Sequence, residues 1–504
     1  MSSTSTLPGS EVATGHNRIL KKIFSFNLAL ASLLVVLSVL TVRARFDDLD
    51  MWWHLKTGEI VWTTHTIPVT DLFSYTTNHH ASIPQEWLAQ TAMYGAYRLG
   101  GLSGLMLWHC ILTSILLVAG FLLCSLYSGN SKVGFAGAMA IWLFATIGIA
   151  IRPQMIGYLL LIVELILIHL GRTRNPRWFF CLPPLFALWV NCHGSFFLGL
   201  LVAGAFVFAS FFNFQAGSLV ARSWDPRCRR MLVWAFVLSV AALFLNPVGI
   251  SQILYPVNTL LHQPLGLSSV DEWKATPFSD ARGVALLAVI FSILLLPILR
   301  RADLYWDELV LLLAGAWLAL NHERMLFVFG ILAAPILSRQ LSTYWEGYRA
   351  DQDRIWPNAV VIGIALLVSV WVFPSPQFLA GQVEKQSPVK AVEFMRAHHI
   401  SGRMLNDYGF GGYLIWAAPE YPVFVDGRAD VFEWSGVFAD YANWVTLQTD
   451  PNELLDKYKI DFCLLTRDAP NVNVLRLMHD WKVVYSDRNS ILFVRARSGN
   501  AAGS

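Results

Sequence analysis

The chain has 504 residues, of which 55% are hydrophobic and only 14% are charged, and its formal net charge is +3. Soluble domains carry about 25% charged residues, so this composition indicates an integral membrane protein. The small net charge and the lack of a basic tract argue against a nucleic acid partner, and the six cysteines do not have the spacing of a disulfide framework.

Residues 1–17 are polar and rich in serine and threonine, and we expect a disordered segment on the cytoplasmic side of the membrane. The basic residues Arg18, Lys21 and Lys22 then precede a long apolar run. This run has no clear small-residue cleavage site, which favours a retained signal-anchor helix over a removed signal peptide.

About eleven apolar runs are candidates for helices that cross a bilayer, which takes about 20 mostly apolar residues. They lie at 20–42, 102–127, 133–151, 153–170, 178–192, 194–214, 231–246, 282–299, 304–320, 323–341 and 356–374. Residues 85–100 are amphipathic and are expected to lie along the interface. The sequence therefore predicts an α-helical polytopic membrane protein whose transmembrane part covers residues 18–378.

Charge sets the orientation of these helices, because Lys and Arg collect in short cytoplasmic loops. Alternate loops hold most of the basic residues, among them Lys132, Arg172, Arg174, Arg177, Arg222, Arg227, Arg229 and Arg230. This alternation places the N-terminus inside the cell. It places everything after residue 374 outside, in the periplasm where the cell has one.

The first outer loop, residues 43–101, opens with a stretch that combines acids, indoles and an imidazole. Asp48 and Asp50 have D-x-D spacing, and Trp52, Trp53 and His54 follow them. In a helix, Asp50 and His54 would share one face at i, i+4. The alternative is that Asp50 only caps a helix and the tryptophans only anchor the headgroup zone.

Later outer loops repeat this concentration of polar residues at the same end of successive helices. They contain Arg152-Pro153-Gln154, Asn191-Cys192-His193-Gly194, Asn246-Pro247, Asp271-Glu272-Trp273-Lys274 and Asn321-His322-Glu323-Arg324. Ionisable groups near membrane depth usually face a protein or water-filled cavity, so their shared side predicts one cavity open to the outside. Each group also has a simpler explanation as a tight turn or a helix-end charge, as for His193 beside Gly194 or Arg152 before Pro153.

Residues 379–497 change character and predict an extracytoplasmic α/β domain, with residues 498–504 as a disordered tail. Helices are expected at 389–399, 453–458 and 472–480, and strands at 403–405, 413–416, 423–426, 461–466, 482–485 and 491–495. Asp426 and Arg428 either face the membrane cavity and help to bind an acceptor, or form a structural pair in a β-turn.

The layout resembles the GT-C superfamily of polytopic glycosyltransferases, which includes protein O-mannosyltransferases, aminoarabinose transferases and oligosaccharyltransferases. More closely, the chain resembles a group of bacterial membrane proteins placed near that superfamily. The residues that carry this resemblance are Asp48 to Leu55 with Thr57-Gly58, Asp71 to Thr76, Glu86-Trp87-Leu88, Arg152-Pro153-Gln154, Asn191 with His193-Gly194, Asn406-Asp407-Tyr408, Gly411 to Trp416 and Val425 to Arg428.

The resemblance implies sugar transfer from a polyprenyl-phosphate-linked donor to a glycan, lipid or protein acceptor on the outer face of the bacterial cytoplasmic membrane. Asp50 matches the position of the superfamily's loop acid, with Asp48 second. This acid would deprotonate the acceptor or help a divalent cation such as Mg²⁺ or Mn²⁺ to do so. Known members often have an adjacent Asp-Glu pair, whereas this chain has D-x-D, so the metal dependence stays open.

Charge, sidedness and aromatic character select the other candidate residues. Arg152, Arg324, His193 and His54 are the candidates for binding the donor phosphate, because a guanidinium matches phosphate oxygens. Trp52, Trp53, Trp87 and Trp273 are the candidates for stacking on a sugar or lining a lipid path. Two other functions use the same features: a non-catalytic carrier or flippase for a lipid-linked glycan, and a scaffold in envelope assembly.

Overall fold

The computed structural model describes residues 20–44, 48–77, 80–146, 148–262, 273–300, 302–345, 347–349 and 353–496. The segments 1–17 and 498–504, which the sequence predicts to be disordered, lie outside these ranges. Asp271 and Glu272 of the fourth polar outer loop also lie outside them.

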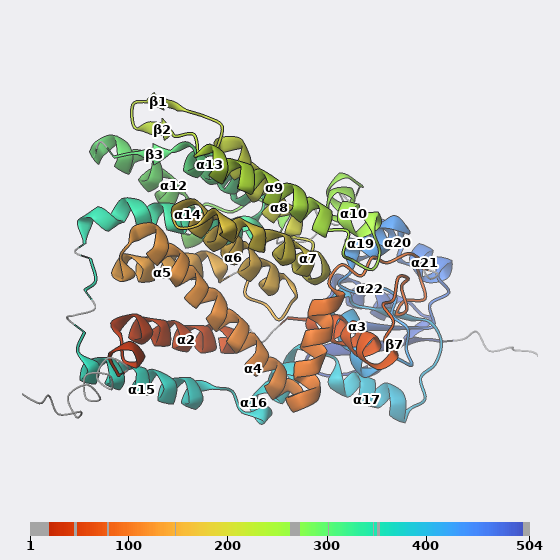
Figure 1. Cartoon of the computed structure of the whole chain (residues 1–504). Helices are drawn as coiled ribbons and strands as arrows, with labels where there is room; N and C mark the ends of the chain where they lie inside the picture. Colours follow the sequence, from red (N-terminus) through yellow and green to blue (C-terminus); the bar gives the residue numbers. More distant parts are fainter. Residues whose placement is uncertain are drawn as a thin grey trace, which may run out of the picture.

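Helices make up most of the described chain up to residue 372 (Figure 1). They are α2 (Phe26–Ala44), α3 (Met51–Thr64), α4 (Trp87–Ser128), α5 (Ser131–Ala145), α6 (Gln154–Thr173), η1 (Pro176–Cys181), α7 (Leu182–Cys192), α8 (Phe196–Ala209), α9 (Pro226–Ala242), α10 (Ile250–His262), α12 (Ala281–Arg300), α13 (Trp306–Asn321), η3 (Glu323–Met325), α14 (Leu326–Leu341), η4 (Ser342–Tyr344) and α15 (Ile355–Val372). Each predicted apolar run thus coincides with helical structure.

Six helices of the described residues are long and apolar enough to cross a membrane. They cover Leu20–Ala44, Trp87–Ser128, Gln154–Thr173, Ala281–Arg300, Glu323–Tyr344 and Ile355–Val372. Other predicted spans form shorter helices, such as α7 with 11 residues and α8 with 14. At about 1.5 Å per residue, these two are shorter than the bilayer core, so the count of eleven crossings stays a prediction.

The predicted interfacial segment and the second predicted span join in one helix, α4. Its 42 residues are interrupted at Gly100 and Gly101, and Gly101 has a left-handed φ of +57°. Glycine tolerates this conformation, so the break changes the direction of the helix there. The part of α4 before the break packs along α3, where a Cβ on Gly58 would lie 2.1 Å from the carbonyl oxygen of Gln90.

A short three-stranded sheet lies among the helices, with the order β1-β2-β3. It consists of β1 (Phe214–Ala216), β2 (Leu219–Ala221) and β3 (Leu304–Tyr305), and it ties the segment after α8 to the start of α13. The sequence pattern did not predict this sheet.

The C-terminal region contains helices and a four-stranded sheet with the order β4-β5-β7-β6. Its elements are α16 (Pro376–Gln386), α17 (Val389–Ala397), β4 (Met404–Asn406), η6 (Tyr408–Phe410), α18 (Gly411–Ala417), α19 (Ala429–Trp434), α20 (Val437–Val445), α21 (Pro451–Lys457), β5 (Phe462–Thr466), α22 (Pro470–Leu477), β6 (Trp481–Ser486) and β7 (Ser490–Arg495). Strand β5 pairs in parallel with β4 and antiparallel with β7, and β6 and β7 form the predicted closing hairpin.

Two strand predictions in this region are wrong. Residues 413–416 lie in helix α18, where Tyr413 and Trp416, three residues apart, share a face and both pack against Trp52 of α3. Residues 423–426 form no named strand and only a single bridge between Val423 and Ser74. Contacts with the first outer loop thus overrode the strand preference of these aromatic and β-branched residues.

The C-terminal region sits directly on the first outer loop. The Tyr75 hydroxyl donates to the carbonyl of Met404 at 2.8 Å, and the Thr76 hydroxyl donates to the carbonyl of Phe424 at 2.7 Å. Figure 1 shows α3 beside the blue C-terminal elements at the end of the helical bundle. Nearby residues of the same two segments, among them Phe73 and Gly427, line the candidate site.

Candidate active site

A cavity of about 200 Å³ lies where α3, α4, α6, α10 and the C-terminal region meet. Its lining combines acids, bases and aromatic rings from far apart in the sequence. Of the predicted site residues it includes Asp50, Trp53, His54, Arg152, His193, Arg324 and Arg428. Four of the five predicted polar loops thus contribute to one cavity, whereas the described residues of the fourth, Asn246, Pro247, Trp273 and Lys274, do not line it.

Asp50 stands at the edge of the cavity, immediately before α3, and shares Arg152 with Asp48. The Arg152 guanidinium contacts Asp48 through Nε at 2.7 Å and Nη2 at 3.0 Å, and it contacts Asp50 Oδ2 at 3.0 Å. The side chain of Asp50 makes no capping hydrogen bond to the helix. The ion pair with Arg152, rather than a helix-capping role, therefore fixes the position of the Asp50 carboxylate.

Asp48 differs from Asp50 in its burial and in its hydrogen bonds. Its side chain is only 3% exposed, it does not line the cavity, and both of its oxygens accept hydrogen bonds from Arg152. One of these oxygens also accepts from the backbone N–H of Asp50 at 3.0 Å. Asp48 thus orients both Arg152 and the chain at Asp50.

A second cluster in the cavity joins Glu86 to two histidines. Glu86 Oε1 lies 3.3 Å from Nε2 of His193, and Oε2 lies 3.5 Å from Nδ1 of His54. The backbone N–H of Ser195 donates to Nδ1 of His193 at 3.0 Å, so the proton of a neutral His193 is on Nε2 and points to Glu86. Gln90 Nε2 lies 3.1 Å from the same nitrogen of His54, Nδ1.

Burial keeps this cluster uncharged. It raises the pKa of Glu86 to about 8, an effect that the nearby Arg324 only partly offsets. Burial, with a smaller contribution from Arg324, lowers the pKa of His193 to about 3, and the pKa of His54 is also lowered well below its usual range by burial. At neutral pH a protonated Glu86 therefore lies between two neutral imidazoles.

Arg324 brings positive charge to the same cavity from the turn before α14. Its guanidinium donates to Oε1 of Gln154 and lies over the ring of Trp273, 5.5 Å from the centroid. Arg324 also acts electrostatically on Glu86, His54 and His193, which shows that it faces the same space. Arg324 and Arg152 thus both present a guanidinium group to this cavity.

The four candidate tryptophans have different environments. Trp53 lines the cavity, while Trp52 points away from it and packs edge-on against Tyr413 with ring centroids 5.4 Å apart. Adjacent helical residues point about 100° apart, which accounts for this difference. Trp87 donates to Oδ1 of Asn191 at 2.9 Å, and Trp273 contacts Arg324; neither of the two lines the cavity.

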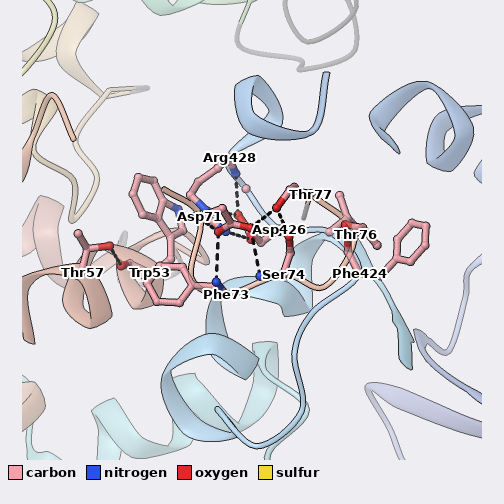
Figure 2. A network of polar contacts seen from close by, with 12 residues as sticks. Trp53, Thr57, Asp71, Phe73, Ser74, Thr76, Thr77, Phe424, Asp426 and Arg428 are labelled. Carbon is pink, nitrogen blue, oxygen red and sulfur yellow. Dashed lines mark hydrogen bonds and ion pairs between the residues drawn. The ribbon is translucent and has the colours of Figure 1, made fainter. Parts of the chain in front are cut away.

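Asp426 and Arg428 form a buried ion cluster with Asp71 of the first outer loop (Figure 2). Arg428 donates to Asp426 through Nε at 2.8 Å and through Nη2 at 2.5 Å, and to Asp71 at 2.7 Å. Burial opposes ionisation of Asp71, but Arg428 and the hydroxyls of Ser74 and Thr77 bring its pKa down to about 2. The cluster joins two distant segments, and Arg428 alone of the pair reaches the cavity lining.

Several lining residues were not among the predicted site residues. Glu86 and Gln90 come from the start of α4, while Tyr255 of α10 donates a hydrogen bond to Asp430 of α19 across the cavity wall. Glu86 lay in the predicted outer loop, but nothing in the sequence signalled that it meets His54 and His193. The burial of a carboxyl group such as that of Glu86 depends on the side chains that surround it in the fold, and the sequence alone does not identify them.

The predicted Asp48 and Asp50 pair is not arranged as a metal site. Across the described ranges, no three or more His, Cys, Asp and Glu side chains come together in a group that could hold a metal ion. Both Asp48 oxygens and one Asp50 oxygen instead face the Arg152 guanidinium. The positive charge beside these acids thus comes from the protein itself.

Comparison with known proteins finds similarity in structure alone, since no protein-family model and no curated protein matches the chain. An oligosaccharyltransferase from Archaeoglobus fulgidus with a tethered acceptor peptide superposes with a TM-score of 0.56 at 12% identity, covering 88% of this chain and 69% of that one. The archaeal oligosaccharyltransferase AglB in complex with an inhibitory peptide and a dolichol-phosphate gives 0.56 at 11% identity over the same shares.

A bacterial structure matches over nearly its whole length. ArnT from Cupriavidus metallidurans bound to undecaprenyl phosphate superposes with a TM-score of 0.52 at 11% identity, covering 96% of this chain and 99% of that one. These enzymes are GT-C glycosyltransferases, so the chain has the membrane fold that its sequence resembles. At such low identity the likeness concerns the fold.

Proposed function

We propose that this chain, which has the GT-C fold, is a membrane glycosyltransferase that moves a sugar from a polyprenyl-phosphate-linked donor to an acceptor on the outer face of the cytoplasmic membrane. The observation that carries the proposal is the placement of the Asp50 carboxylate and the Arg324 guanidinium on one cavity of about 200 Å³. The structural neighbours bound to dolichol-phosphate and undecaprenyl phosphate support a donor of this class.

The reaction needs a base, a nucleophile and a stabilised leaving group. The acceptor's nucleophilic oxygen forms a bond to carbon 1 of the sugar, and its proton passes to the Asp50 carboxylate. The bond between carbon 1 and the phosphate oxygen breaks, and the polyprenyl phosphate leaves with the electron pair. Arg324 stabilises the charge that grows on that phosphate, as a fixed cation in a partly dry site does most effectively.

Asp48 and Arg152 support Asp50. Arg152 forms an ion pair with the Asp50 carboxylate at 3.0 Å, and Asp48 in turn holds Arg152 at 2.7 Å. A structure of the archaeal enzyme contains Zn and sulfate, but the Asp48–Asp50–Arg152 arrangement does not suit a cation, and no step of the proposal passes through Mg²⁺ or Mn²⁺.

The proposal includes the predicted organisation of the chain. The transmembrane part is residues 18–378, with the outer loop 43–101, and the extracytoplasmic α/β domain is residues 379–497. The alternation of basic loops supports an inside N-terminus and an outside C-terminal domain. The glycan, lipid or protein acceptor then binds from the outside, beside the C-terminal wall of the cavity.

Incubation of the purified chain with a panel of polyprenyl-phosphate sugars and an envelope extract tests the proposal. We expect free polyprenyl phosphate to accumulate together with a glycosylated acceptor, both followed by mass spectrometry. A carrier or flippase would bind the donor without releasing its sugar. Binding without turnover across the whole panel would therefore contradict the enzyme.

A further inference from the structure

Two buried polar atoms beside His54 lack hydrogen-bond partners among the described residues. They are Oε1 of Gln90, whose residue is only 3% exposed, and Nε1 of Trp53. Both residues line the cavity. The amide oxygen of Gln90 can accept a hydrogen bond, and the indole N–H of Trp53 can donate one.

The positions of these two atoms are fixed by the packing of α3 against α4. The rings of Trp53 and His54 have centroids 3.6 Å apart, and Gln90 Nε2 lies 3.1 Å from Nδ1 of His54. Gly58 lets the two helices approach until only a hydrogen atom fits between its Cα and the carbonyl of Gln90. His54 is therefore in contact with both Trp53 and Gln90.

An unsatisfied buried polar group is destabilising, and a ligand that satisfies such a group at the wall of a cavity explains its presence there. Orphan atoms elsewhere, such as Oε1 of Gln340, belong to residues that do not line this cavity. A hydroxyl group can satisfy either of these atoms, because it can accept from an indole N–H and donate to an amide oxygen.

We propose that Trp53, His54 and Gln90 form a subsite for a hydroxyl group of the transferred sugar, and that this sugar is uncharged at that position. This inference rests on the proposed function and specifies its donor. The three side chains carry no formal charge at neutral pH, so they match a hydroxyl better than a carboxylate or an ammonium group. The subsite lies within electrostatic reach of Arg152 and Arg324, close to the place proposed for the donor phosphate.

The test compares donors with and without a sugar. The affinity of the purified full-length protein is measured for decaprenyl phosphate and for decaprenyl-phosphate-linked glucose, mannose and galactose. The variants are Gln90→Leu and Trp53→Phe; the second removes the indole N–H and part of the ring system but keeps an aromatic side chain. Gln340→Leu is the matched control, because Gln340 likewise has a bonded Nε2, here to the backbone carbonyl of Ile293, and an orphan Oε1.

We expect Gln90→Leu and Trp53→Phe each to weaken the best sugar-bearing donor roughly tenfold and to leave decaprenyl phosphate unchanged within about twofold. Gln340→Leu should change neither affinity. One deoxy analogue of the best sugar-bearing donor should bind the wild-type protein as weakly as the intact donor binds Gln90→Leu. The affinity of this analogue should be the same for Gln90→Leu as for the wild-type protein.

Equal weakening of both probes, or no weakening of the sugar-bearing donor, would overturn the subsite. A loss seen only in the affinity for the acceptor would overturn it as well, since the hydroxyl would then belong to the acceptor. If the wild-type protein releases sugar from the donor and both variants bind the sugar-bearing donor with wild-type affinity, the subsite is wrong and the proposed function stands. If the wild type binds none of the probes, the proposed function itself fails.

Discussion

A methyl group on Gly427 would lie 1.8 Å from Oδ1 of Asp50, closer than real Cβ contacts come. The candidate base therefore rests against bare backbone of the C-terminal region. Gly427→Ala should push Asp50 away from Arg152 and reduce the kcat/KM of sugar transfer roughly 100-fold, as displacements of about 1 Å in an active site do.

The control for this substitution is Gly381→Ala in α16, where a Cβ meets open space. This variant should retain wild-type activity. The melting temperature of each purified variant separates misplacement of Asp50 from unfolding. Full activity of Gly427→Ala would show that contact with this backbone does not position Asp50.

Asp50→Asn should reduce sugar transfer by about 100- to 10,000-fold, the usual contribution of a general base. The amide keeps the size of the carboxylate but cannot take the acceptor's proton. Donor affinity, measured by direct binding to the polyprenyl-phosphate sugar, should remain within severalfold of the wild type. A variant that still turns over at the wild-type rate would remove Asp50 from the chemistry.

Arg152→Gln should destabilise the protein by about 3 kcal/mol, because it leaves the buried Asp48 carboxylate without its cation. Arg222→Gln is the matched control, since the Arg222–Asp303 pair is largely exposed and such pairs contribute about 1 kcal/mol or less. Thermal unfolding in detergent measures both. Equal melting temperatures for the two variants would mean that Asp48 gains another partner or becomes protonated without a cost.

Glu86→Gln should alter how stability depends on pH. Burial raises the pKa of Glu86 to about 8 in the folded protein, so the folded state holds a proton that the unfolded chain releases above about 4.5. Stability is then lost as the pH rises from about 4.5 through 8. Glutamine cannot ionise, so the variant should melt roughly 2–5 °C higher than the wild type at pH 9 and close to it at pH 5.

Glu59→Gln provides the comparison, because Glu59 is paired with Lys56 and more exposed than Glu86. Its melting profile should follow the wild type between pH 5 and pH 9. A wild-type profile for Glu86→Gln over the same range would show that Glu86 is already ionised in the folded protein.

Hydropathy was enough to predict the helices, because each apolar run must bury its backbone polar groups in a helix when it enters a bilayer. It could not predict how far Pro and Gly shorten them, as in α7, which ends at Cys192 before His193 and Gly194. The sheet topology after residue 400 was predicted at β5 and the β6–β7 hairpin. It failed at Tyr413 and Trp416, whose helical face is set by Trp52, a residue more than 350 positions earlier.

The candidate site was predictable where sidedness alone brings residues together, as for Asp50, Arg152, His193 and Arg324. The sequence did not distinguish Trp52 from Trp53, because adjacent helical residues point about 100° apart, and here one indole packs in the core and the other faces the cavity. The role of Glu86 depends on burial between two imidazoles, which no linear pattern encodes. The unmatched atoms of Gln90 and Trp53 likewise become visible only in three dimensions.

The ion cluster of Asp71, Asp426 and Arg428 joins segments up to 357 residues apart in the chain. During synthesis the first of these segments leaves the ribosome long before the last one exists. The candidate site therefore cannot be complete until nearly the whole polypeptide has been made. A chain that ends before residue 426 would carry every helix from α2 to α15 and still lack the C-terminal wall of the cavity.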